Sequence, residues 1–152
     1  DLPPARGRPQ SGPLDGDGRR SIYLELRRSF LPSFLSVFGM PNATEALGQR
    51  DLANVPSQSL ALMNSPVVHE QARAWAKRLI EDHADPQTRI AEIHYAAFGR
   101  PPRDPEIQWC QDLLNDVAVA KQLKSDEATH GLEAWEALCH VVMNRKEFIY
   151  LF

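Results

Sequence analysis

The sequence predicts a mainly α-helical protein, a bundle or array of about four to six helices behind an extended N-terminal segment. One observation is a set of three polar–proline pairs, Ser65–Pro66, Asp85–Pro86 and Asp104–Pro105. Such pairs are typical of helix starts, because the amide hydrogen that proline lacks has no partner in the first turn anyway. A second observation is that apolar residues recur at helical spacing after each pair, and a third is that the links between these segments are short.

The N-terminal residues predict little regular structure. Residues 1–18 hold four prolines and four glycines, so we interpret them as a linker or a docked loop. In residues 19–28 the apolar side chains alternate, which predicts either one short half-buried strand or the start of a helix toward Phe38. We interpret residues 19–152 as a single helical domain. Because the chain has no N-terminal methionine, we expect it to be a fragment of a larger chain.

Short elements follow before the first long helix. Residues 31–38 predict a brief helix that ends at Gly39, a residue suited to the left-handed conformation of a helix stop. Another short helix is predicted over residues 45–47. Residues 54–58 are interpreted as a turn that leads into the apolar run at 60–63.

Four longer helices make up the rest of the predicted domain. The first three start at the polar–proline pairs, and the second is stopped by Gly99 and the two prolines after it. The fourth ends near Asn144. Each helix has one apolar face, and the faces are Val68–Ala72–Trp75–Leu79, Ile90–Ile93–Ala97, Ile107–Cys110–Leu114–Val117 and Leu132–Trp135–Cys139–Val142.

Composition and motifs exclude several classes of function. The chain has 20 acidic and 17 basic residues, whereas proteins that bind nucleic acid typically have a basic excess, so we predict no nucleic-acid partner. No apolar run approaches the roughly 18–20 residues that span a bilayer. The five histidines share no metal-ligand spacing, and Glu136 stands where the haem-attachment motif C-x-x-C-H needs its first cysteine. We therefore predict no metal and no cofactor in this segment, and no catalytic motif is visible.

A few residues are candidates for binding or cross-linking. Trp109 falls off the apolar face of its helix and is the best candidate for an exposed contact residue. Cys110 and Cys139 are either two buried thiols or one disulfide between neighbouring helices. Arginine forks bind sulfate and phosphate well, so the N-terminal arginines and the tyrosine among them are candidates for an anion-binding strip or for solvated charges. These residues are Arg19, Arg20, Tyr23, Arg27 and Arg28.

Four blocks of the chain resemble a known family. They read RRSIYLELRR, NVPSQSLALMNSP followed by VVHEQARAWAKRL, FGRPPRDPE and WEALCHVVMNRKEFIYLF. In order and spacing they resemble the planctomycete-specific C-terminal domain of unknown function in large exported planctomycete proteins, which often also have cytochrome c-like segments. The resemblance implies an extracytoplasmic location, in the periplasm or at the cell surface. It implies that any haem belongs to the parent chain and that the upstream domains of that chain are partners.

At the positions shared with this family we expect structural roles. Gln58 and Asn64 can hydrogen-bond loop backbone, and Gly99 can end a helix with Arg100 reaching the helix-end carbonyls. Glu147 can pair with an arginine of the first block such as Arg28.

Besides a catalytic fragment whose site is completed by an upstream domain, two functions stay open from the sequence. The first is a non-enzymatic helical module with an association role beside a redox (cytochrome c-like) or ligand-binding domain. The alternative is a domain that binds acidic or sulfated polysaccharide, or an accessory hydrolase domain at the cell surface, with the N-terminal arginines and Trp109 as contact residues.

Overall fold

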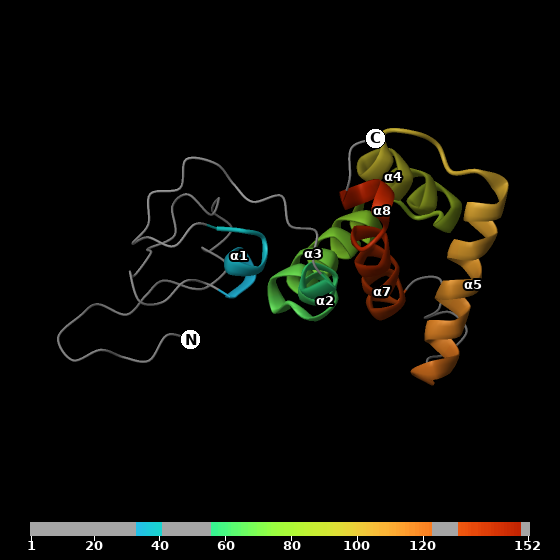
Figure 1. Cartoon of the computed structure of the whole chain (residues 1–152). Helices are drawn as coiled ribbons and strands as arrows, with labels where there is room; N and C mark the ends of the chain where they lie inside the picture. Colours follow the sequence, from blue (N-terminus) through green and yellow to red (C-terminus); the bar gives the residue numbers. More distant parts are fainter. Residues whose placement is uncertain (1–32, 41–55, 123–130, 150–152) are drawn as a thin grey trace. The chain divides into compact units, whose positions relative to one another are not determined.

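The computed structural model describes residues 33–40, 56–122 and 131–149 (Figure 1). Within these ranges the chain forms helices and no strand, which confirms the mainly α-helical class. The strand predicted at 19–28 and the helix at 45–47 lie outside the described residues. The helices are α1 (Ser33–Val37), α2 (Pro56–Asn64), α3 (Pro66–Asp82), α4 (Pro86–Phe98), α5 (Asp104–Ala120), α7 (Leu132–Met143) and α8 (Lys146–Ile149). No helix in these ranges has both the length and the apolar character needed to cross a bilayer.

The chain divides into two compact units, residues 1–61 and residues 62–152. In the first unit, α1 ends at Gly39, whose φ of 74° is in the left-handed region, as predicted. The rings of Phe34 and Phe38 pack with their centroids 5.0 Å apart. The side-chain amide of Gln58 donates to the carbonyl oxygen of Val37, the last residue of α1, at 3.3 Å.

The turn predicted at residues 54–58 is partly wrong, because Pro56 is the first residue of α2. A proline before a run of helix-compatible residues suits both a turn and a first helical position, and the sequence pattern was interpreted as the former.

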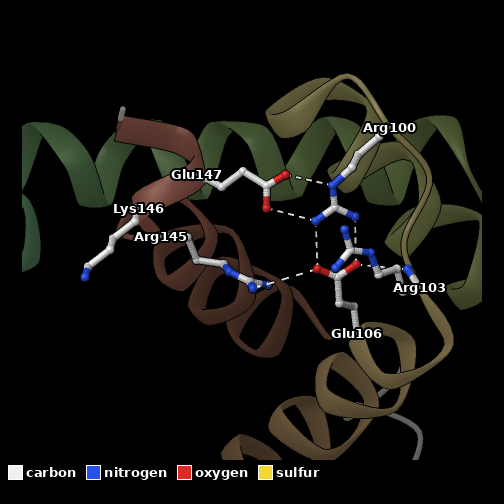
Figure 2. A pocket seen from close by; sticks show the side chains of 6 residues that line it. All are labelled: Arg100, Arg103, Glu106, Arg145, Lys146 and Glu147. Atoms are coloured by element: carbon white, nitrogen blue, oxygen red, sulfur yellow. Dashed lines mark hydrogen bonds and ion pairs between the residues drawn. The ribbon is translucent and has the colours of Figure 1, made fainter. Parts of the chain in front are cut away.

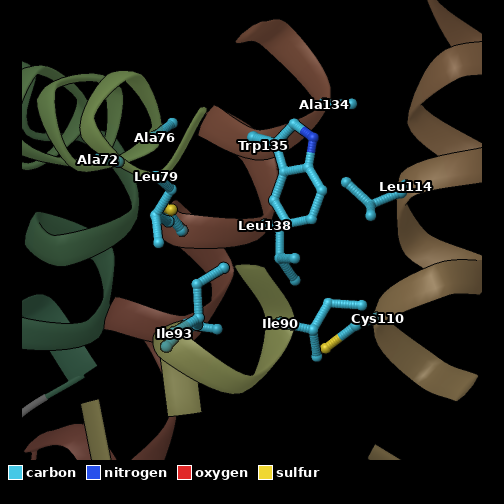
Figure 3. Packing of buried hydrophobic residues seen from close by; sticks show 12 residues of the cluster. Ala72, Ala76, Leu79, Ile90, Ile93, Cys110, Leu114, Ala134, Trp135 and Leu138 are labelled. Carbon is cyan, nitrogen blue, oxygen red and sulfur yellow. The ribbon is translucent and has the colours of Figure 1, made fainter. Parts of the chain in front are cut away.

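The core of the second unit lies between α3, α4, α5 and α7, and the packing of α3 against α7 is the most extensive. Trp135 and Leu138 of α7 are fully buried, and Figure 3 shows them between Leu114 of α5 and the alanines of α3. The small side chains of Ala72 and Ala76 allow α7 to approach α3 closely. The buried cluster consists of Ala72, Ala76, Leu79, Ile90, Ile93, Cys110, Leu114, Ala134, Trp135, Leu138, Cys139 and Val142.

Two of the predicted apolar faces are rotated slightly in the structure. On α3 the inner face passes through Ala76, which is fully buried like Ala72, whereas Trp75 is half-buried at the edge of the cluster. On α5 the inner face continues to Ala118, and Val117 is half-buried. Helical spacing alone predicts that the larger apolar side chain is the buried one. Where two helices pack closely, the smaller side chain is buried at the point of contact.

The ends of α3, α4 and α7 lie at the residues that the sequence pattern predicted. Asp85 caps α4, and its carboxylate accepts from the backbone amide of Thr88 at 2.8 Å. Gly99 ends this helix with a φ of 68°. Ser65 precedes α3 as predicted, although its hydroxyl makes no capping hydrogen bond. Asn144 ends α7 and donates from its side chain to the carbonyl oxygen of His140.

Candidate functional site

A charged hollow of about 590 Å³ lies where α4, α5 and α8 come together (Figure 2). We call it the charged hollow throughout. It has four basic and two acidic side chains, so its formal charge is positive. Its lining residues are Arg100 and Arg103 of the α4–α5 link, Glu106 of α5, Arg145 of the α7–α8 link, and Lys146 and Glu147 of α8.

Local sequence builds one wall of this hollow. Gly99 ends α4 in the left-handed conformation, and two prolines with restricted φ follow. Arg103 then has an extended backbone, and α5 begins at Asp104. Glu106 occupies the third position of α5, and its Oε2 accepts from the backbone amide of Arg103 at 2.9 Å. This is one half of a capping box, since Arg103 has no side-chain acceptor for the other half.

Arg100 is the centre of the cluster, and all five of its guanidinium hydrogens have acceptors. Nε and Nη2 donate to the two carboxylate oxygens of Glu147 at 2.7 and 2.8 Å. Nη1 and Nη2 donate to the two oxygens of Glu106, both at 2.8 Å. Nη1 also donates to the carbonyl oxygen of Pro101 at 3.1 Å. Arg100 therefore holds two carboxylates at once, each in the bidentate geometry that a guanidinium favours.

The two carboxylates differ in how firmly they are held. The side chain of Glu106 is 14% exposed, and that of Glu147 is 37% exposed. Hydrogen bonds from Arg100, supported by the Arg103 amide, lower the pKa of Glu106 to about 2. The same guanidinium also lowers the pKa of Glu147, and the two acids raise the pKa of Arg100. All three groups are therefore charged at neutral pH.

Arg145 connects the hollow to an aromatic surface. Its guanidinium lies 5.4 Å from the ring centre of Trp109 and 5.7 Å from that of Phe98. Its Nη2 is 3.8 Å from an oxygen of Glu106. Figure 2 shows Arg145 directed toward Glu106, whereas Lys146 points away from the carboxylates. Among the described residues, the side chains of Arg103 and Lys146 have no carboxylate partner.

The two cysteines are buried as free thiols in the structure. Burial raises the pKa of the Cys110 thiol to about 11 and that of Cys139 to about 12. Both thiols are therefore protonated at neutral pH, and the thiol is a much weaker nucleophile than the thiolate.

Two histidines far apart in the sequence meet in space. The rings of His69 on α3 and His140 on α7 stack with centroids 4.1 Å apart. Their Nε2 atoms lie 3.1 Å from the carbonyl oxygen of Met63 and 3.3 Å from that of Leu62, so they satisfy carbonyls at the end of α2. The described ranges contain no group of three or more potential metal ligands.

The sequence pattern identified two residues of the hollow, Arg100 and Glu147, but did not predict the ion pair between them. It expected Arg100 to reach helix-end carbonyls, but its guanidinium binds Glu106 and Glu147. Glu147 thus has a partner other than Arg28, which lies outside the described residues together with Arg19, Arg20, Tyr23 and Arg27. Trp109 is 39% exposed, and Asn64 is the last residue of α2.

Four lining residues were missed, namely Arg103, Glu106, Arg145 and Lys146. A signal for one of them was present, since a glutamate at the third position of a helix after Gly-Arg-Pro-Pro is placed to accept from the N-terminal amides. No local signal links these residues to α8, because Arg100 and Glu147 are 47 residues apart.

Comparison with known proteins gives a family and no activity. No curated protein and no solved structure matches the chain. One family pattern, described as PSD1, protein of unknown function (DUF1553), matches residues 4–114, which is well over half of the chain. The hollow is made partly of residues inside this range and partly of residues after it. The chain therefore belongs to the PSD1 (DUF1553) family of proteins of unknown function.

Proposed function

We propose that this chain is a non-enzymatic helical module that associates with an acidic segment of a neighbouring domain through the charged hollow. The observation that carries this proposal is the excess of cations in the hollow. Both acids there already bind Arg100, while the side chain of Arg103 has no carboxylate partner among the described residues. Arg145 lies 3.8 Å from an oxygen of Glu106 and also contacts two aromatic rings. Such a surface favours a partner with negative charge.

The state of the reactive groups supports a non-enzymatic role. General acid–base catalysis at neutral pH is most efficient when the pKa of the catalytic group is near neutral. The two carboxylates of the hollow instead have lowered pKa values and are held as anions. The buried thiols have raised pKa values and are held protonated. These groups are therefore arranged for binding and packing.

The setting that we propose rests on the resemblance to the planctomycete C-terminal domain. In that setting the module is part of a large exported planctomycete protein and works outside the cytoplasm. Its partners are the upstream domains of the same chain, including a cytochrome c-like or ligand-binding domain, and a redox partner of that domain. Haem, if present, belongs to the parent chain.

The binding proposal can be tested with a defined acidic peptide. We expect a fluorescein-labelled hexaglutamate to bind the 152-residue chain at low ionic strength, with fluorescence anisotropy as the readout. Arg103→Gln should weaken binding by about fivefold, since it removes one exposed cation from the hollow. Added salt should weaken binding further.

The matched control is Lys77→Gln, which removes one positive charge from an exposed position on α3 outside the hollow. Its affinity should stay close to that of the wild type. If the wild type does not bind hexaglutamate at low salt, or if both variants lose affinity equally, the hollow is not the binding site.

A second candidate function is binding of acidic or sulfated polysaccharide, alone or as the accessory domain of a hydrolase. The observation that favours it is the contact between Trp109 and Arg145, because an exposed indole suits a sugar face and a guanidinium suits its acidic group. Preference for a sulfated or uronic-acid oligosaccharide over hexaglutamate in the same assay would favour this candidate.

A further inference from the structure

Glu147 occupies a carboxylate subsite that a partner could also use. Arg100 presents two forks, Nε with Nη2 and Nη1 with Nη2, and each holds one carboxylate in bidentate contact. Figure 2 shows the two carboxylates along two adjacent edges of the same guanidinium, and the two edges share Nη2. The fork is therefore already arranged for a carboxylate, whichever residue supplies it.

The Glu106 carboxylate is fixed in place by its own helix. It is 14% exposed and also accepts from the backbone amide of Arg103, with Arg145 as a further neighbour at 3.8 Å. It sits only six residues from Arg100, on the helix that the link leads into. Displacing it would leave the first turn of α5 without this acceptor.

The Glu147 carboxylate is the more exchangeable of the two. Its side chain is 37% exposed, and both of its described hydrogen bonds come from Arg100. It belongs to α8, which has only four residues, and the two residues after it, Phe148 and Ile149, are 43% and 39% exposed. A single short helix turn has little stability of its own, so its position depends on such contacts.

We infer that Glu147 is an internal stand-in for the carboxylate of the partner, and that a glutamate or aspartate side chain of the acidic segment displaces it from Arg100. This inference rests on the proposed function, because it names the group that the hollow receives. When Glu147 leaves, the hollow gains one unit of positive charge and the fork loses both acceptors. The incoming carboxylate restores the charge and the two hydrogen bonds.

The first test removes the stand-in. Glu147→Gln should bind labelled hexaglutamate about tenfold more tightly than the wild type, as expected if Glu147 fills the fork for about nine-tenths of the time. Because this variant also makes the chain more positive, the control is Glu133→Gln. Glu133 is an exposed glutamate of α7 that pairs with Lys121 outside the hollow. The control should tighten binding by less than about twofold.

The second test uses the unchanged chain, so it does not depend on the folding of a variant. Saturating hexaglutamate should speed amide hydrogen exchange in residues 146–149, because α8 loses its contact with Arg100. Unchanged or slower exchange there would overturn the inference.

The inference and the proposed function can fail separately. If Glu147→Gln gains no more affinity than Glu133→Gln while Arg103→Gln still weakens binding, Glu147 is a structural residue and the hollow remains the binding surface. If hexaglutamate does not bind the wild type at low ionic strength, both fail.

Discussion

At the scale of single residues, Gly99 is where backbone conformation decides the geometry of the hollow. Its φ of 68° turns the chain at the end of α4 and places Arg100 at the centre of the hollow. A β-carbon at this position would meet no atom within 4 Å, so the cost of a side chain is that of the left-handed backbone alone.

We predict that Gly99→Ala lowers the free energy of unfolding by about 1 kcal/mol. Urea denaturation followed by circular dichroism would measure it. Asparagine tolerates the left-handed region better, so Gly99→Asn should cost less than Gly99→Ala. Equal losses for the two variants would show that the backbone is not the cause.

Single residues also show how far sequence reasoning reaches. The roles of Gly99 and Asp85 could be predicted because a helix end depends on neighbours within a few residues. The partner of Arg100 could not, since Glu147 is 47 residues away and is brought close only by the packing of α4 against α8. The His69–His140 stack was missed for the same reason, because it exists only once α3 and α7 are packed.

At the scale of elements, Arg100 joins the ends of three helices. It follows the last turn of α4, binds Glu106 in the first turn of α5 and binds Glu147 in α8. A change in the charge of either acid therefore loosens a junction between elements. This makes the junction sensitive to acid, and the direction follows from the lowered pKa values.

We predict that acid destabilises this junction between pH 4.5 and about 2. The pKa of Glu106 falls from 4.5, its ordinary value, to about 2 in the folded chain. A lowered folded-state pKa contributes stability that is fully present above 4.5 and is lost as the pH falls through about 2. The lowered pKa of Glu147 acts in the same direction.

The measurement is the Tm by circular dichroism at a series of pH values. Glu106→Gln should have a lower Tm than the wild type near neutral pH, and its Tm should fall less between pH 4.5 and about 2. Glu133→Gln, whose acid pairs with Lys121 away from the hollow, provides the comparison. Parallel curves for Glu106→Gln and the wild type would contradict the prediction.

Elements were predicted better than their contacts. The three polar–proline pairs correctly predicted where α3, α4 and α5 begin, to within a residue. The sequence could not predict that Ala76 is buried on the inner face of α3 while Trp75 lies at its edge. Which of the two is buried depends on how closely α7 approaches α3. Pro56 was misinterpreted because the same residue suits a turn and a helix start.

At the scale of the whole molecule, the buried cluster and the family match cover different ranges. Every residue of the cluster lies between Ala72 and Val142. The match covers residues 4–114 and ends inside α5, so it leaves out α7 entirely. Yet α7 supplies Trp135 and Leu138, and it packs against both α3 and α5. The folded unit therefore extends beyond the matched range.

This difference leads to a prediction about two fragments. Residues 56–152 contain α2 whole and every member of the cluster, so we expect this fragment to unfold cooperatively in urea. Residues 1–114 keep α3 and α4 but lack α7, so Ala72, Ala76 and Leu79 lose the helix that covers them. Removing that much buried apolar surface should abolish cooperative unfolding of this fragment. Sharp urea transitions in both fragments would contradict this, because they would show that α3 and α4 can form a core without α7.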